Sequence, residues 1–173
     1  MRRDFVERHA ARLLEEHPYT GAHAADVCEL LDSCTLQRVE AGQAICRQGD
    51  AAGALFVLLV GRVWVLQHDD AGVAHTLAVF SRPRVFGHLG ALDGRPREAT
   101  CLAEGPVLMA RLPGHRALAM LSATEGAGCA LRRLLLHSLT DELGQATASL
   151  RSATHAPVSE PEYFLPAPAR YAG

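Results

Sequence analysis

The stretch from Val85 to Thr100 holds the residues of this chain that are best suited to binding an anion. It begins with a glycine turn at Gly87, continues into a short apolar segment and a Gly-Arg-Pro loop, and places Arg97 just before a strand-like run. Backbone N–H groups at the start of a short helix present partial positive charge, and a nearby arginine adds a forked, permanently charged donor. The stretch therefore predicts a site for one phosphate group.

The sequence offers less support for catalysis or for a bound metal. No nucleophile–base pair or pair of carboxylates stands out, and the close His-x-His followed by Glu of metal-dependent jelly-roll enzymes is missing. Nine histidines leave room for a metal or haem sensor, but they lack tight ligand spacing. The candidate pair is His68 and His75, which flank a turn and could face each other across a hairpin. We predict a protein that is not an enzyme, with no catalytic residues, no metal site and no required cofactor.

Composition gives no electrostatic reason to expect nucleic acid or a membrane as a partner. The 173 residues carry a formal net charge of −2, and 49% of them are hydrophobic, enough for the core of one domain with appendages. Neither a membrane span nor a signal peptide is predicted, so we expect a cytoplasmic protein. All 17 basic residues are arginine, which is typical of GC-rich bacterial genomes.

The cysteines favour a reducing compartment. They are odd in number, scattered, and never spaced as C-x-x-C. We expect buried free thiols, and no partner pair is evident from the spacing. The residues are Cys28, Cys34, Cys46, Cys101 and Cys129.

The elements that must position the anion site begin with two helices and continue as short strands. Helical spacing predicts helices over Arg2–His17 and Ala22–Asp32, the second capped by Thr20. From Cys34 the pattern changes to short apolar runs separated by Gly and Asp turns, which predicts an all-β barrel or sandwich. Gly61 is expected at a bend or a close backbone approach. The predicted strands are Thr35–Val39, Ala44–Arg47, Leu55–Val60, Arg62–Gln67, Val73–Phe80, Ala99–Ala103 and Val107–Leu112.

After Leu112 the helical period returns. It predicts a short helix over Arg116–Leu121, with Pro113 at its start, and a longer one from Ala127 to about Leu150. The apolar stripe of the long helix is broad for one helix, so part of it packs either on its own domain or against a second copy. The stripe consists of Leu131, Leu134, Leu135, Leu136, Leu139, Leu143 and Leu150.

Helices, a strand region with glycines at its corners and a terminal helix together resemble the cyclic nucleotide-binding domain family, as in Crp-like proteins and protein kinase A regulatory subunits. The likeness spans roughly Val27 to Leu143. It implies a mainly β fold, a double-stranded β-helix (jelly roll) with N-terminal helices and a long C-terminal helix, but without the DNA-binding domain of the family's transcription factors. The residues that carry it are Ala41–Ile45, Gln48–Asp50, Leu55–Gly61, Phe86–His88 and Arg97–Thr100.

With this resemblance the chain divides into four parts. We expect N-terminal helices over 1–33, a β-roll over 34–112 with a phosphate-binding cassette at 85–100, and C-terminal helices over 113–151. The segment 152–173 is rich in proline and is predicted to be disordered. Tyr163-Phe164-Leu165 inside it is either a partner-binding peptide or part of a flexible end.

The resemblance assigns roles within the cassette, position by position. The family's cassette reads Phe-Gly-Glu, a short helix, then Arg and two small residues. Its glutamate binds the ribose 2′-hydroxyl and its arginine binds the cyclic phosphate. Carried over, Arg97 is the phosphate arginine. Gly87, Leu89 and Gly90 begin the cassette, and Ala99 and Thr100 close the pocket.

Two positions depart from that cassette. His88 stands in place of the glutamate, and a neutral imidazole lacks the charge-assisted bond of a carboxylate, worth on the order of 1.5–3 kcal/mol, which weakens the ribose contact about 10- to 100-fold. Glu98 stands where a small residue is usual. It either pairs with Arg97 and fills the site, or points outward because neighbouring strand residues face opposite ways. Arg97 either contacts an anion or pairs with Glu98 or Asp93.

These assignments imply a regulatory module that binds cyclic AMP, cyclic GMP or a similar phosphate ligand weakly. Its signal would leave through a homodimer built on the C-terminal helix, over Leu131–Leu143, or through an unidentified protein partner. The alternative is a β-roll without a ligand that serves as a protein–protein interaction module. Thr140 lies where family members often touch the base, and we expect it to face solvent.

Overall fold

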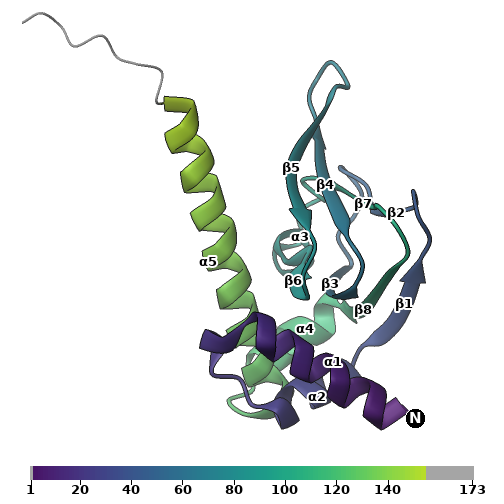
Figure 1. The fold of residues 1–173 in the computed structure, drawn as a ribbon, viewed down its shortest axis with the longest axis vertical. Coiled ribbons are helices and arrows are strands. Elements are labelled where there is room, and N and C mark those ends of the chain that lie inside the picture. Colours follow the sequence, from purple (N-terminus) through teal and green to yellow (C-terminus); the bar gives the residue numbers. More distant parts are fainter. Residues whose placement is uncertain (1, 155–173) are drawn as a thin grey trace, which may run out of the picture. The chain divides into compact units, whose positions relative to one another are not determined.

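Two four-stranded antiparallel sheets form the β-roll drawn in Figure 1, and they confirm the predicted mainly β fold with flanking helices. The computed structural model describes residues 2–154, so most of the proline-rich segment, with Tyr163-Phe164-Leu165, lies outside the described residues. The first sheet has the order β1 (Thr35–Val39), β8 (Val107–Pro113), β3 (Ala54–Val60) and β6 (Arg84–Phe86). The second has the order β2 (Ala44–Cys46), β7 (Thr100–Ala103), β4 (Val63–His68) and β5 (Ala74–Phe80).

β3 is one of the strands that contribute to both cores, together with β8 and β6. Its odd-numbered residues, Leu55, Val57 and Leu59, belong to a core formed with the helices, whereas Phe56 and Leu58 belong to the core of the β-roll. Because successive side chains point to opposite faces, a strand covered on both sides needs an unbroken apolar run. This explains the apolar sequence Ala54–Val60.

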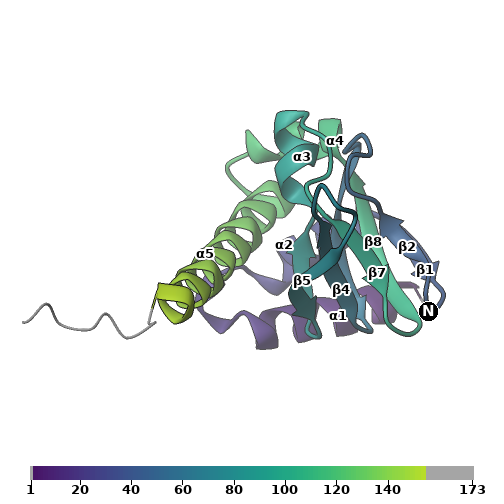
Figure 2. The same ribbon diagram turned by 90° about the horizontal axis from the view of Figure 1, so that it is seen from above.

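The helices cover one end of the roll, as Figures 1 and 2 show for α1, α2 and α4. No helix within residues 2–154 is long and apolar enough to cross a membrane. Gly61, with a φ of 103°, approaches the backbone so closely that a Cβ would lie 2.6 Å from the carbonyl oxygen of Pro106, which confirms its predicted role. The helices are α1 (Arg2–Glu16), the 3₁₀ turn η1 (Pro18–Thr20), α2 (Ala24–Asp32), α3 (His88–Asp93), α4 (Gly114–Leu121) and α5 (Gly126–Thr154).

Two local predictions were wrong. Thr20 does not cap α2, which begins after His23 without a side-chain cap; the Thr20 hydroxyl instead donates to the carbonyl of His17 at 2.9 Å. The strand β6 was missed, because three residues after Pro83 are too few to show a period of two. β6 is nevertheless fully buried and pairs with β3.

The leucine stripe of α5 divides into two sets. Leu131, Leu134 and Leu135 are buried in the core that the helices share with β3 and β8. Leu136 and Leu139 are 64% and 40% exposed. The buried set packs on its own domain and cannot form the predicted dimer contact, so packing against a second copy stays a prediction for the exposed set alone. The first compact unit of the chain ends at Asp141, and the second contains the rest of α5. In that second unit Leu143 and Leu150 are also exposed.

Candidate anion-binding site

Gly87 joins β6 to α3 in the left-handed conformation, with a φ of 66°. L side chains rarely adopt this conformation, whereas glycine does so without steric cost. A Cβ at this position would lie 2.8 Å from Nη1 of Arg97 and 3.2 Å from the ring of Phe56. Gly87 therefore supplies both the turn and the space that the arginine occupies.

Arg97 lies buried beside this turn, with 7% of its surface exposed. Its Nη1 donates to the carbonyl of Gly87 and its Nη2 to the carbonyl of Ala54, each at 2.5 Å. The guanidinium carbon lies 5.3 Å from the ring centroid of Phe56, which is within cation–π range. Two backbone carbonyls and one aromatic ring thus hold the charged group in place.

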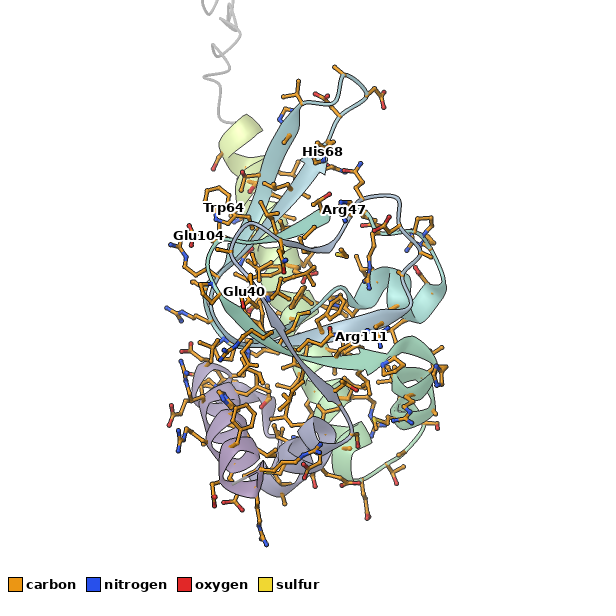
Figure 3. All side chains as sticks on the ribbon, turned by 90° about the vertical axis from the view of Figure 1, so that its right-hand side faces the viewer. Glu40, Arg47, Trp64, His68, Glu104 and Arg111 are labelled. Carbon is orange, nitrogen blue, oxygen red and sulfur yellow. The ribbon has the colours of Figure 1, made fainter. Side chains whose placement is uncertain are left out.

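The main chain of Arg97 is fixed by the turn at Gln48–Asp50. Its N–H donates to the carbonyl of Asp50 and its carbonyl accepts from the N–H of Gly49, both at 2.8 Å. The side chain of Gln48 ties that turn to β4, because it accepts from the N–H of His68 at 2.7 Å and donates to its carbonyl at 3.1 Å. His68 is labelled in Figure 3, near the end of the roll where this turn lies.

No carboxylate of the described residues neutralises Arg97. The nearby carboxylates form salt bridges with Arg95 instead. Nε of Arg95 lies 2.5 Å from Oδ2 of Asp93, and its Nη1 lies 3.8 Å from Oε1 of Glu98. The Glu98 side chain is 55% exposed, so it points outward and the suggested pairs of Arg97 with Glu98 or Asp93 are wrong. A buried charge without a counter-ion is costly, and an anion from outside the chain would remove that cost.

His88 lies deeper than the family resemblance alone would suggest. It is 3% exposed, and burial, followed by the charge of Arg84, lowers the pKa of its imidazole. The ring is therefore neutral at pH 7. Arg84 comes from β6 and lies 4.3 Å from the ring centroid of Phe80.

Three phenylalanines connect the two buried arginines. The ring centroids of Phe56 and Phe86 are 5.3 Å apart, and those of Phe86 and Phe80 are 5.8 Å apart. Arg97 contacts the Phe56 end of this row and Arg84 contacts the Phe80 end. Sequence reasoning missed Phe56 and Arg84. The alternation of β3 places Phe56 inside the roll and could have shown it, whereas Arg84 followed a segment interpreted as a turn.

The other cassette residues shape the loop around Arg97. Gly90 packs α3 against the chain, since a Cβ there would lie 2.4 Å from the carbonyl oxygen of Arg95 and 2.6 Å from Cβ of Ala52. The Thr100 hydroxyl accepts from the N–H of Gln48 at 3.1 Å. Ala99 is half-buried and Leu89 is 41% exposed. The part that these residues play in closing a pocket stays a prediction. A groove between α1 and α2 contains none of them.

Two cysteines meet beside this site, which the spacing did not indicate. Cys46 of β2 is the register partner of Cys101 of β7. A hydrogen bond with Cys101, with a further contribution from the charge of Arg97, lowers the pKa of the Cys46 thiol, whereas burial raises that of Cys34 to about 12. All five thiols are free as predicted, but only Cys34 and Cys101 are buried.

The candidate histidine pair of the hairpin does not form. His75 is the register partner of Gln67, so it shares a face with Gln67 and not with His68. Its Nε2 lies 2.9 Å from Oδ2 of Asp69, and both side chains are exposed. Thr140 is exposed as expected, and its hydroxyl donates to the carbonyl of Leu136 at 2.8 Å.

A family model described as the cyclic nucleotide-binding domain matches residues 36–124, just over half of the chain. The chain belongs to the cyclic nucleotide-binding domain family. The matched span of this family runs from β1 to the residues after α4, and it includes Arg97, Gly87 and the turn at Gln48–Asp50.

Curated relatives match about half of the chain. The cAMP-dependent protein kinase regulatory subunit of Blastocladiella emersonii is 31% identical over 80 residues, which cover 46% of this chain and 20% of the relative. That of Mycosarcoma maydis is 32% identical over 89 residues, covering 51% and 17%. The chain thus spans about a fifth of the length of these curated relatives.

Solved structures agree with the fold. A cyclic nucleotide-binding domain from Methylobacillus flagellatus superposes with a TM-score of 0.74 at 20% identity, covering 88% of both chains. A c-di-GMP-responsive global regulator from Xanthomonas campestris gives a TM-score of 0.68 at 20% identity, covering 77% of this chain and 66% of its own. At this identity the likeness establishes the family's β-roll with a long C-terminal helix.

Proposed function

We propose that this chain is a regulatory module that binds a cyclic nucleotide, or a similar small phosphate ligand, with its phosphate at Arg97. One observation carries the proposal: the buried guanidinium is aimed by two backbone carbonyls and has no carboxylate partner in residues 2–154. A phosphate that replaces those carbonyls as the acceptor would give the guanidinium a counter-ion in a site shielded from water. The relatives' names, which refer to cyclic AMP and to c-di-GMP, support the same class of ligand.

The affinity is expected to be low because of His88. The buried imidazole is neutral and cannot replace the carboxylate that binds the ribose hydroxyl in the family's cassette. Glu98 adds little repulsion, because it points outward and is paired with Arg95. The weakened contribution to the binding free energy is therefore the ribose contact, not the phosphate contact.

We propose a second copy of the chain as the partner through which the signal leaves. Four exposed leucines and one exposed alanine of α5 follow one another at intervals of three and four, which is the spacing of a coiled-coil seam. Its four leucines are between 40% and 68% exposed, although large apolar side chains usually avoid water when they gather in a stripe. The seam consists of Leu136, Leu139, Leu143, Ala146 and Leu150.

Calorimetric titration of the full chain with cyclic AMP, cyclic GMP and cyclic di-GMP tests the ligand proposal. We expect binding of at least one ligand in the micromolar range or weaker. Replacing Arg97 by Ala should weaken it on the order of 100-fold, because a charge-assisted hydrogen bond of about 1.5–3 kcal/mol is lost. Arg97→Lys retains the positive charge and is the control for a loss of binding that is caused by misfolding.

Arg95→Ala is the matched control, because Arg95 lies two residues away but is exposed and paired with Asp93. It should leave the affinity unchanged. Nanomolar binding by the natural chain would contradict the weakened ribose contact. If no ligand binds at millimolar concentration, the alternative is favoured: a β-roll that serves only as an interaction module. The loss of binding would then be attributed to His88.

A further inference from the structure

His17, His137 and Asp141 converge at a place remote from the cassette in sequence. His17 follows α1, while His137 and Asp141 lie one turn apart on α5. Each residue offers one ligand atom, and these atoms all lie within 4.8 Å of one another. The two rings meet edge to face with centroids 4.5 Å apart, and Nδ1 of His137 lies 3.3 Å from Oδ2 of Asp141.

The hydrogen bonding of His17 leaves one nitrogen prepared for coordination. Its Nε2 lies 2.7 Å from the carbonyl oxygen of Pro83. A carbonyl can only accept, so Nε2 carries the proton and Nδ1 carries the lone pair. Nδ1 is buried and has no hydrogen-bond partner, in a residue that is only 6% exposed. A ring nitrogen held by a backbone carbonyl, with the opposite lone pair unused, is the arrangement that orients histidines at metal sites.

We infer that His17, His137 and Asp141 form a binding site for a divalent first-row metal ion, with Zn²⁺ as the expected occupant. Two imidazoles and a carboxylate are ligands that Zn²⁺ accepts, and a water molecule would take the fourth position on the side where Asp141 is 41% exposed. The nearby charge of Arg84 opposes the cation, and the carboxylate of Asp141 offsets it. A bound ion would fasten the residues after α1 to the His137–Asp141 turn of α5.

The histidines were not recognisable in the sequence because His17 lies 120 positions before His137. Only the packing of α5 beside the end of α1 brings them together. The site shares no residue with the cassette, although the charge of Arg84 acts on both His17 and His88. Its failure would leave the proposed ligand binding untouched.

Cobalt provides the test, because tetrahedral Co²⁺ absorbs visible light and reports the type of ligand. The full chain, first treated with a chelator, should bind Co²⁺ with such a spectrum and without a thiolate charge-transfer band, and micromolar Zn²⁺ should displace it. With Zn²⁺ at about 100 times its dissociation constant the Tm should rise by about 5–10 °C.

His137→Ala and Asp141→Asn alter residues that are partly exposed, so the fold should survive both. His137→Ala should abolish Co²⁺ binding and Asp141→Asn should weaken it at least 10-fold. The matched control is His75→Ala, which breaks an exposed His–Asp pair without a third ligand and should change nothing. The inference is overturned if His137→Ala leaves binding intact, if the spectrum shows thiolate ligation, or if neither Co²⁺ nor Zn²⁺ binds at submillimolar concentration.

Discussion

At the scale of single residues, position 88 sets the expected affinity. His88→Glu would restore the carboxylate of the family's cassette and place it near the positive charge of Arg84. We expect cyclic nucleotide binding about 10- to 100-fold tighter, the value of one charge-assisted hydrogen bond. Calorimetry checks this against His88→Gln, which is polar but uncharged. Equal affinities for the two variants would show that the ribose contact is not the limiting term.

Alanine substitutions at Gly87 and Gly94 distinguish the effect of crowding Arg97 from the effect of backbone strain. Both have a positive φ, 66° and 77°, but a Cβ would meet Nη1 of Arg97 only at Gly87, and nothing lies within 4 Å of Gly94. A left-handed alanine costs roughly 1–2 kcal/mol, so Gly94→Ala should lower the Tm by about 2–8 °C. Gly87→Ala should lower it further and also weaken ligand binding. Equal thermal shifts in differential scanning fluorimetry, with unchanged binding, would contradict the close packing.

At the scale of elements, α5 carries the surface that we propose pairs two copies. We expect the full chain to dimerise, and the double variant Leu139→Glu with Leu143→Glu to be monomeric, because like charges would face each other across the seam. Leu118→Glu is the control, an exposed leucine of α4 outside the seam. Sedimentation at high concentration measures the mass, and a monomeric natural chain would rule out this output.

The strands show which elements the sequence could predict. β1 was predicted to the residue and β3 to within one residue. For β3 the signal is an unbroken apolar run between Gly53 and Gly61. β6 was missed because its burial comes from pairing with β3, a long-range contact without a local signature. The same limit hid Cys46 and Cys101, which only the register of β2 with β7 brings together.

At the scale of the whole molecule, buried histidines should make the fold sensitive to acid. Burial lowers the pKa of His88, with Arg84 adding to it, and that of His9, with Arg12 and Arg8 adding to it. The unfolded chain therefore takes up these protons first, so stability is full above about pH 6.5 and is lost as the pH falls below it. His88→Gln should lose less stability than the natural chain between pH 7.5 and 5.5 in urea unfolding. If His88→Gln loses as much unfolding free energy as the exposed control His115→Gln, His88 contributes nothing to the acid sensitivity.

The family fold followed from the glycine framework and the cassette residues, whereas the state of the site did not. The sequence placed Arg97 beside Gly87 through the resemblance alone. It left open whether the Glu98 side chain fills the site. The answer depends on Arg95, because Arg95 forms salt bridges with both Asp93 and Glu98. Side-chain pairing in a loop is decided by competition between neighbours in space, and spacing along the chain does not record it.

The central claim is that Arg97 is the phosphate contact of this chain. A crystal structure of the full chain grown with saturating cyclic AMP tests it most directly. We predict density for a phosphate within hydrogen-bond distance of the Arg97 guanidinium, with its bonds to Gly87 and Ala54 replaced or shared. A structure in which the nucleotide binds elsewhere, or in which the site beside Arg97 stays empty at millimolar ligand while the guanidinium keeps both carbonyls, would contradict the claim.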